Sequence, residues 1–177
     1  MASRAPLSLK ARAIGLLAQR EHSRAELRRK LLRIEKQRLQ QALLAAARAV
    51  DGSDDSTLAA TEQEDAGDAE SAVDALLDTL AADGYLDETR FIESRLHLRA
   101  GRFGAQRIQQ ELAQHGLRLD AEQQATLRAS ELERAREVWH KRFGPEPSQE
   151  PAERARQTRF LLARGFAPDM VRRLLRV

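Results

Sequence analysis

The sequence predicts an all-α protein built from tandem three-helix repeats, and three observations support this. Alternating runs of Val, Ile and Thr are missing from the 177 residues, so we expect no strand. Apolar residues recur instead at helical spacing in several segments, most of them bounded by glycine or by a capping residue. Aromatic residues make up only 4% of the chain and charged residues 32%, so the cores should be small and formed mainly by Leu and Ala.

Two helices open the first repeat. Residues 8–19 carry an apolar stripe, and Ser23 with Glu26 then forms a capping box, in which each side chain serves a free N–H of the first turn. Strong helix formers follow, and neither Gly nor Pro interrupts them before Gly52. We therefore expect the second helix to reach about Val50, which makes it unusually long.

An acidic insert follows this helix. Residues 51–70 contain eight Asp and Glu residues and no Lys or Arg, a composition that predicts a solvated, disordered loop. Ser71 with Asp74 is expected to cap the third helix, which should end at Gly84. Outside the insert, the chain contains 30 Lys and Arg residues and 19 Asp and Glu residues, which gives a net charge of +11. A basic helical protein of this kind is expected to bind a polyanion or an acidic protein surface. The acidic insert could act as a lid over the basic part of the chain.

The segment 84–117 shows the repeat most clearly. Asp87 is a suitable N-cap for one helix, and Gly101 is expected to end it. Gly104 then opens a second amphipathic helix, which Gly116 closes. Neither short helix is stable alone in water, so both must pack against further helices.

Helical signals continue to the C-terminus. Asp120 is expected to cap a helix, and residues 131–143 carry an apolar stripe that includes the single tryptophan. A Gly-Pro-Glu-Pro break begins at Gly144. Residues 151–164 form the next predicted helix, and Pro168 occupies a favourable first position of the last one.

One helix-ending pattern occurs three times. In each copy a Leu precedes a Gly by four positions and an apolar residue follows the Gly, as in a Schellman stop with its hydrophobic contact. The copies are Leu80-x3-Gly84-Tyr85, Leu112-x3-Gly116-Leu117 and Leu161-x3-Gly165-Phe166. The pattern predicts three repeats in an elongated, curved molecule. Their predicted bounds are 7–83, which contains the long helix and the acidic loop, 87–129 and 131–177.

These residues resemble a known family. The string GYLDETRF, followed by RAGRFGAQRIQQEL and HGL, resembles the core of the RecX regulatory proteins. SRAELRRKLL and RFLLARGF…VRRLLR are similar to the first and third repeats of that family. The likeness covers about 140 of the 177 residues. The chain departs from the family at Glu88, where Asp is common, and at about 37–70, where most members have a short turn. The signature positions are Gly84, Tyr85, Leu86, Asp87, Arg90, Phe91, Gly104, Gly116 and Gly165.

The resemblance implies a fold of three tandem three-helix units in a curved rod. It also implies a non-enzymatic negative regulator of homologous recombination and DNA repair, connected with the SOS response. Family members bind the RecA protein filament in its helical groove, where they suppress ATP hydrolysis and strand exchange and limit filament growth. They can also contact single- or double-stranded DNA weakly.

Three groups of basic residues are candidates for contacts with a protein partner or with DNA. Each could also be an ordinary solvated helix face. The C-terminal group is the densest, because few acidic residues accompany it. The candidates are Arg24, Arg28, Arg29, Lys30 and Arg33; Arg99, Arg102 and Arg107; and Arg154, Arg156, Arg159, Arg164, Arg172, Arg173 and Arg176.

Two other function classes were weighed. A helix-turn-helix-like DNA-binding transcriptional regulator is the alternative, with Gln106, Arg107, Gln109 and Gln110 as the nearest base-reading candidates. No helix, however, combines a base-reading face with a dimerisation element. An enzyme is not predicted, because no catalytic constellation or phosphate loop occurs. The four histidines lack ligand spacing and are expected at surfaces or helix ends, so neither a metal nor a cofactor is expected.

The chain is expected to be a soluble, cytoplasmic monomer. Cysteine is absent, in keeping with a reducing compartment. The N-terminal residues lack the apolar core of a signal peptide. The longest apolar run, residues 42–47, is too short to cross a bilayer, so no membrane contact is expected.

Overall fold

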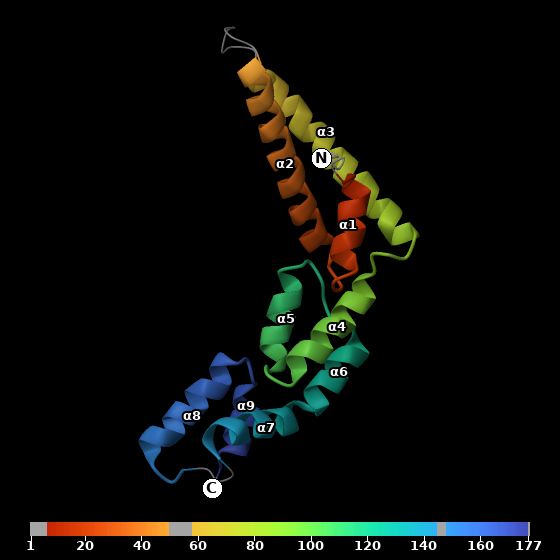
Figure 1. The fold of residues 1–177 in the computed structure, drawn as a ribbon. Helices are drawn as coiled ribbons and strands as arrows, with labels where there is room; N and C mark the ends of the chain where they lie inside the picture. The colour runs from red at the N-terminus through yellow and green to blue at the C-terminus, as the bar shows by residue number, and fades with distance from the viewer. Residues whose placement is uncertain (1–6, 50–57, 145–147, 177) are drawn as a thin grey trace, which may run out of the picture. The chain divides into compact units, whose positions relative to one another are not determined.

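The computed structural model describes residues 7–49, 58–144 and 148–176, and within these ranges every regular element is an α-helix (Figure 1). The all-α prediction is therefore confirmed for the described part of the chain. Its contacts fall into an N-terminal unit, residues 1–88, and a C-terminal unit, residues 89–177. The predicted bounds of three repeats and the predicted curved shape stay predictions.

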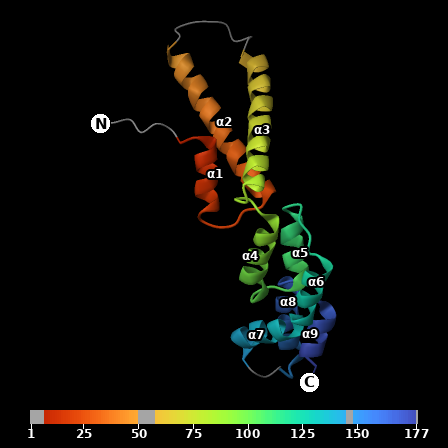
Figure 2. The ribbon, with the colours of Figure 1, turned by 90° about the vertical axis from the view of Figure 1, so that its right-hand side faces the viewer.

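The N-terminal unit consists of α1 (Leu9–Leu17), α2 (Arg24–Ala49) and α3 (Leu58–Ala82). The long helices α2 and α3 lie side by side and run in opposite directions, and α1 packs beside the first turns of α2 (Figures 1 and 2). Capping residues start the first two helices: Ser8 Oγ accepts from Ala11 N (3.2 Å), and Ser23 Oγ accepts from Glu26 N (3.1 Å), the latter as predicted. The buried apolar residues of the core of this unit are Ala13, Leu27, Leu31, Val73, Leu77, Leu80 and Leu86.

The prediction of a disordered acidic loop over residues 51–70 is wrong for residues 58–70. These residues form the first half of α3, and Ser71 lies inside that helix instead of capping it. The segment is rich in Ala, Glu and Gln, which are good helix formers, and its last acid, Glu70, pairs with an arginine of α2. Residues 50–57, which include the predicted end of α2 at Val50, lie outside the described residues.

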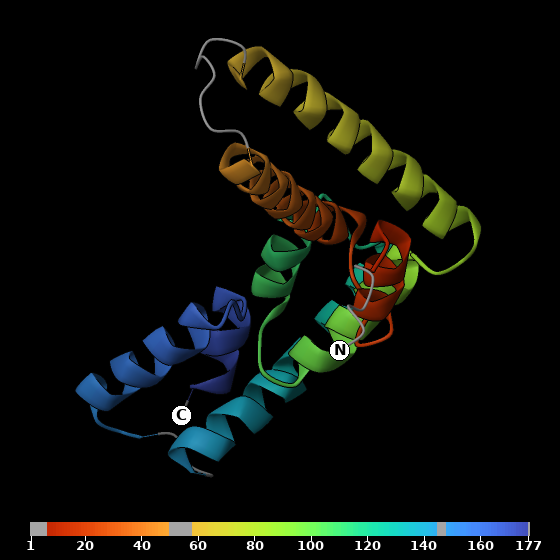
Figure 3. The same ribbon diagram turned by 45° about the horizontal axis from the view of Figure 1, so that its top comes forward.

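The described part of the C-terminal unit contains six helices. The first three share one buried cluster and the last three share another, with Trp139 in the second. In Figure 3 the ribbon of this unit runs from the green of the first of these helices to the dark blue of the last. Leu98 does not join either cluster, since 62% of it is exposed. The helices are α4 (Glu88–Ala100), α5 (Ala105–Ala113), α6 (Ala121–Ala129), α7 (Glu131–Phe143), α8 (Pro151–Ala163) and α9 (Pro168–Leu174).

All three predicted Schellman stops are present. The carbonyl oxygens of Leu80, Leu112 and Leu161 accept from the N–H five positions later, at 2.9, 3.0 and 3.3 Å. The glycine of each stop is left-handed, with φ of +75°, +76° and +80°. Tyr85 departs from the pattern, because 49% of it is exposed and the next residue, Leu86, is buried in its place.

The two clusters of the C-terminal unit are joined by backbone contact between Gly104 and Gly165. Gly104 N donates to Arg164 O (2.9 Å), and Gln106 N donates to Gly165 O (3.3 Å). A Cβ atom on Gly104 would lie 2.1 Å from Gly165 O. Two of the glycines in the RecX-like signature therefore allow the start of α5 to approach the end of α8 closely.

A buried carboxylate fastens the same junction. Glu131, at the start of α7, is only 2% exposed. Its Oε1 accepts from Ala105 N (3.1 Å) and Ala167 N (3.3 Å), which lie at the starts of α5 and α9. Free N–H groups and the helix dipole both favour an anion at a helix N-terminus. One side chain thus accepts hydrogen bonds from the N-terminal N–H groups of two helices that belong to different clusters.

Arg134 completes this junction from the next turn of α7. It donates to Ala100 O (2.9 Å), Phe103 O (2.8 Å) and Leu127 O (2.7 Å). These oxygens lie at the ends of α4 and α6 and in the loop before α5. Burial lowers the pKa of the Arg134 guanidinium, while the nearby charge of Glu131 opposes this change.

The Gly104 contact predicts a large effect of a single methyl group. Gly104→Ala should lower the free energy of unfolding by about 3 kcal/mol, because the added carbon overlaps backbone that cannot move aside. Gly101→Ala is the matched control: its Cβ meets nothing within 4 Å, so the change should stay within about 0.5 kcal/mol. Urea unfolding followed by the fluorescence of buried Trp139 measures both. Equal effects of the two variants would contradict the close approach.

Glu131 should matter far more than an ordinary acidic residue. Glu131→Ala should cost about 3 kcal/mol, because it leaves two N–H groups without an acceptor in a buried site. Glu131→Gln keeps one acceptor oxygen and should cost less. Glu133→Ala is the control, because that side chain is 64% exposed and pairs with Arg136 at the surface. The same unfolding measurement applies, and equal losses at positions 131 and 133 would refute the junction.

Candidate functional site

Two of the candidate arginines on α2 form ion pairs with acidic residues of α3. Arg24 Nη2 lies 2.8 Å from Asp78 Oδ1. Arg28 Nε donates to Asp74 Oδ1 at 2.7 Å, and its Nη2 donates to Glu70 Oε2 at 3.0 Å. The hydrogen bond to Asp74 raises the pKa of Arg28 most, and the hydrogen bond to Glu70 raises it further. The same hydrogen bond from Arg28 lowers the pKa of Asp74. The α2–α3 pair thus neutralises part of its own basic face.

A second network surrounds Glu26 at the start of α2. Its carboxylate is hydrogen-bonded to Arg20, and it lies 3.3 Å from His22 Nδ1 and 3.6 Å from Lys30 Nζ. Burial alone would raise the pKa of Glu26, but the Arg20 bond and the charges of His22, Arg20 and Lys30 lower it to about 2. His22 was expected at a surface or a helix end; it lies at the start of this helix, but it is buried. Burial lowers the pKa of His22, and the positive charge of Arg20 lowers it further.

The other two candidates on α2, Arg29 and Arg33, have no acidic partner among the described residues. Arg29 Nε donates to Ala25 O of its own helix (3.3 Å). Arg33 is exposed, and within the described ranges no acid pairs with it. Of the five candidates on α2, three therefore hold the fold together, which leaves Arg29 and Arg33 for a partner.

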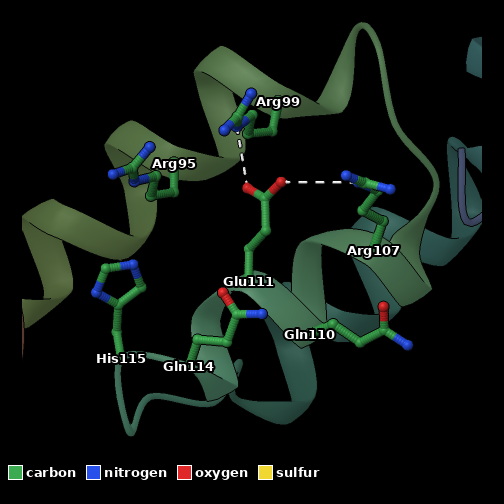
Figure 4. A pocket seen from close by; sticks show the side chains of 7 residues that line it. All are labelled: Arg95, Arg99, Arg107, Gln110, Glu111, Gln114 and His115. Carbon is green, nitrogen blue, oxygen red and sulfur yellow. Dashed lines mark ion pairs between the residues drawn. The ribbon is translucent and has the colours of Figure 1, made fainter.

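Two of the central candidates, Arg99 and Arg107, lie at a groove between α4 and α5, with a volume of about 460 Å³ (Figure 4). Glu111 lies between these two: its Oε2 is 3.0 Å from Arg99 Nε, and its Oε1 is 3.9 Å from Arg107 Nε. Arg95 lines the same groove, one turn before Arg99. Arg95 is not among the candidates predicted from the sequence, although its i, i+4 relation to Arg99 could have indicated it.

Aromatic rings support these arginines. The guanidinium carbons of Arg99 and Arg107 lie 5.4 and 5.3 Å from the centroid of Phe103, and that of Arg95 lies 5.1 Å from the centroid of Phe91. Such stacking holds the planar guanidinium group in place through cation–π attraction. Arg102 lies farther from Phe103, at 6.0 Å, and lines a separate hollow with Arg142 and Arg164, among others.

The C-terminal candidates divide by their surroundings. Arg154, Arg172 and Arg176 line a groove of about 430 Å³ between α8 and α9. Arg156 pairs with Glu153 (3.3 Å), and Arg164 stacks on Phe160 at 4.3 Å. Arg159 and Arg173 are exposed. The structure thus gathers three of the seven around one groove.

The signature residues have mainly structural places. Gly84, Gly116 and Gly165 are the left-handed glycines of the three stops. Leu86 and Phe91 are core residues, Gly104 lies at the junction, Asp87 directly precedes α4, and Arg90 and Tyr85 are exposed.

Comparison with known proteins shows the family. Residues 129–175 match the family model described as "RecX, third three-helix domain". A protein named "Regulatory protein RecX" from Ralstonia nicotianae is 45% identical, and the match covers 97% of this chain and 89% of the relative. The chain belongs to the RecX family of regulatory proteins. The RecX proteins of Leptothrix cholodnii (44% identical, 100% and 94% covered) and Pseudomonas putida (38%, 96% and 90%) agree.

RecX membership supports a regulatory role, since the relatives are named as regulatory proteins. Across the described ranges, no three His, Cys, Asp or Glu side chains are grouped so that they could hold a metal ion. No helix in the described ranges has the length and apolar character needed to span a bilayer.

The network around Glu26 predicts how the N-terminal unit responds to acid. The pKa of Glu26 is about 2 in the fold against 4.5 ordinarily, so its contribution is complete above pH 4.5 and is lost toward pH 2. The lowered pKa of His22 adds a loss that begins below its ordinary value of 6.5. Glu26→Gln should cost up to about 3 kcal/mol at pH 7, and this difference from the wild type should shrink toward pH 2. Urea unfolding followed by far-UV circular dichroism measures it; a difference independent of pH would contradict the network.

Proposed function

We propose that this RecX-family chain is a negative regulator of homologous recombination and DNA repair that binds the RecA–DNA filament. It would inhibit ATP hydrolysis, strand exchange and filament extension without catalysing a reaction. The observation that carries the proposal is the match to RecX regulatory proteins over nearly the whole chain. Such a regulator would act in the cytoplasm as a monomer, where the SOS response to DNA damage requires control of RecA.

Charge distribution supports the C-terminal unit as the main contact surface. This unit carries 18 Lys and Arg residues against 11 Asp and Glu residues, a net charge of +7. The N-terminal unit carries 12 against 16, a net charge of −4. A DNA-bound filament presents phosphates, which attract the basic unit and repel the acidic one.

The partner-binding residues proposed are the candidate basic side chains outside the two ion-pair networks of the N-terminal unit. Arg24, Arg28 and Lys30 are left out because they pair with the acids of those networks, on α3 and at Glu26. The groove between α8 and α9 ranks highest, because its arginines surround a partly apolar floor of Val171 and Leu175. The proposed set is Arg29, Arg33, Arg99, Arg102, Arg107, Arg154, Arg156, Arg159, Arg164, Arg172, Arg173 and Arg176.

A transcriptional regulator fits the structure less well. Its recognition helix would be α5, which carries Gln106, Gln109 and Gln110. Base reading in the major groove uses the N-terminal residues of such a helix. Here that end of α5 is packed on Gly165 and bound by Glu131, so it is not free to enter a groove.

The test is ATP hydrolysis by RecA on single-stranded DNA, titrated with this protein below one molecule per RecA. The wild type should suppress hydrolysis. The variant R154A/R172A/R176A should need roughly tenfold more protein, because it loses three charge-assisted contacts. The control R118A/R128A/R136A removes the same charge from exposed positions elsewhere and should change the titration less than twofold.

Two results would count against this proposal. Hydrolysis that is untouched by the wild type would refute filament inhibition. If the protein at the same time preferred one duplex sequence over bulk DNA, the transcriptional reading would replace it.

A further inference from the structure

A basic hollow in the C-terminal unit is lined by the turn after α4 and by the C-terminal parts of α7 and α8. It has a volume of about 270 Å³, and none of its lining residues is an acid. We propose that this hollow binds a compact phosphate anion, either inorganic pyrophosphate or the di- or triphosphate group of a nucleotide. The site is independent of the proposed function, because its binding is measured on the chain alone. The positively charged lining residues are Arg102, Lys141, Arg142 and Arg164.

The positive charges of this hollow are not neutralised within the fold. In the described part of the C-terminal unit, the acids that form ion pairs do so with other basic residues. Arg164 is half-buried, and its Nε atom is buried without a hydrogen-bond partner among the described residues. A charge that is partly removed from water and left unpaired raises the free energy of the fold. An anion in the hollow would lower it.

Basic residues near helix C-termini often have a purely structural role, because they balance the helix dipole and bind the last carbonyls. At the ends of α4 and α8, however, other side chains make these contacts. Arg134 donates to Ala100 O (2.9 Å), and Arg107 donates to Ala163 O (3.4 Å). Neither of these arginines lines the hollow. The carbonyls at the two helix ends therefore do not account for the arginines of the hollow that follow them.

An aromatic ring holds one of these arginines in place. The guanidinium carbon of Arg164 lies 4.3 Å from the centroid of Phe160, which also lines the hollow. Phe160 is in turn packed edge to face against Phe143, with 5.1 Å between the ring centroids. Stacking orders the planar guanidinium group, which binds the oxygens of a phosphate through two parallel N–H donors. A side chain that is already ordered loses less freedom when it binds a ligand.

Size and charge favour a compact anion over a nucleic-acid strand. A terminal phosphate carries a charge of about −1.5 to −2 at pH 7. Each phosphate of a strand carries only a single negative charge. Four basic side chains around so small a hollow therefore match a ligand that concentrates its charge in a few linked phosphates. Because clefts that enclose drug-sized ligands measure about 300–1,000 Å³, this hollow should contact the phosphates and leave a nucleoside outside.

The experiment is isothermal titration calorimetry of the full chain with sodium pyrophosphate, at low salt and without divalent cations, which would compete for the phosphates. The wild type should bind with a stoichiometry near one and a Kd below about 1 mM. R102A/R164A should weaken binding roughly tenfold, because it removes two charge-assisted contacts. R118A/R128A makes the same change of charge at exposed positions that do not line the hollow, and should leave affinity within about twofold.

A second variant guards against misfolding, since Arg164 also packs on an aromatic ring. If R102A/R164A melts early by circular dichroism, K141A/R142A replaces it. Both of these residues are exposed on α7 and line the hollow, so their removal should weaken binding by a similar factor without unfolding the unit.

ADP and AMP distinguish the two sources of phosphate. AMP should bind roughly tenfold more weakly than pyrophosphate, because it offers one phosphate instead of a linked pair. Equal affinities for ADP and pyrophosphate would support a site for phosphates alone, and a roughly tenfold higher affinity for ADP would support a nucleotide.

Four results would overturn the site. They are the absence of pyrophosphate binding by the wild type, unchanged affinity in a folded variant of the hollow, an equal loss in R118A/R128A, and binding of citrate as tight as that of pyrophosphate. Displacement of pyrophosphate by oligothymidylate at an equal concentration of phosphate groups would also overturn it, in favour of a nucleic-acid strand.

Discussion

The C-terminal unit depends on one buried carboxylate. Without a link, residues 89–177 would be two small helical clusters, each with its own few apolar side chains. Glu131 binds the starts of α5 and α9 together, and Arg134 binds the ends of α4 and α6. A buried charge is costly unless it is well hydrogen-bonded. Here the helix ends supply the partners, and the same bonds satisfy groups that would otherwise be orphaned.

Local signals in the sequence predicted most helix ends. The Leu-x3-Gly stops and the caps at Ser23 and Asp120 depend on residues within about five positions, so a single sequence contains the whole interaction. The acidic segment 58–70 was mispredicted because its stabilising partner is remote: Arg28 is 42 positions from Glu70. Composition shows the charges of such a segment but not the oppositely charged helix beside it.

The candidate site could be predicted only as a set of arginines. Sequence counts cannot separate Arg28, which pairs with two acids of α3, from Arg99, which stacks on Phe103 and borders an open groove. Glu131 carried no signal at all, since an acid in the first turn of a helix is ordinarily a solvated residue. Its burial follows from the approach of Gly104 to Gly165, a contact across about sixty positions of chain.

The position of Glu131 also bears on how the chain can be divided. The family model of the third three-helix domain starts at residue 129, so it includes the carboxylate and Ala167 but excludes Ala105. A fragment cut there would expose the backbone surface of Gly165 and leave Glu131 with one of its two helix ends. In this part of the molecule, one sequence repeat is therefore shorter than the segment that we expect to fold cooperatively. For this reason a boundary between repeats is a poor place to truncate the chain.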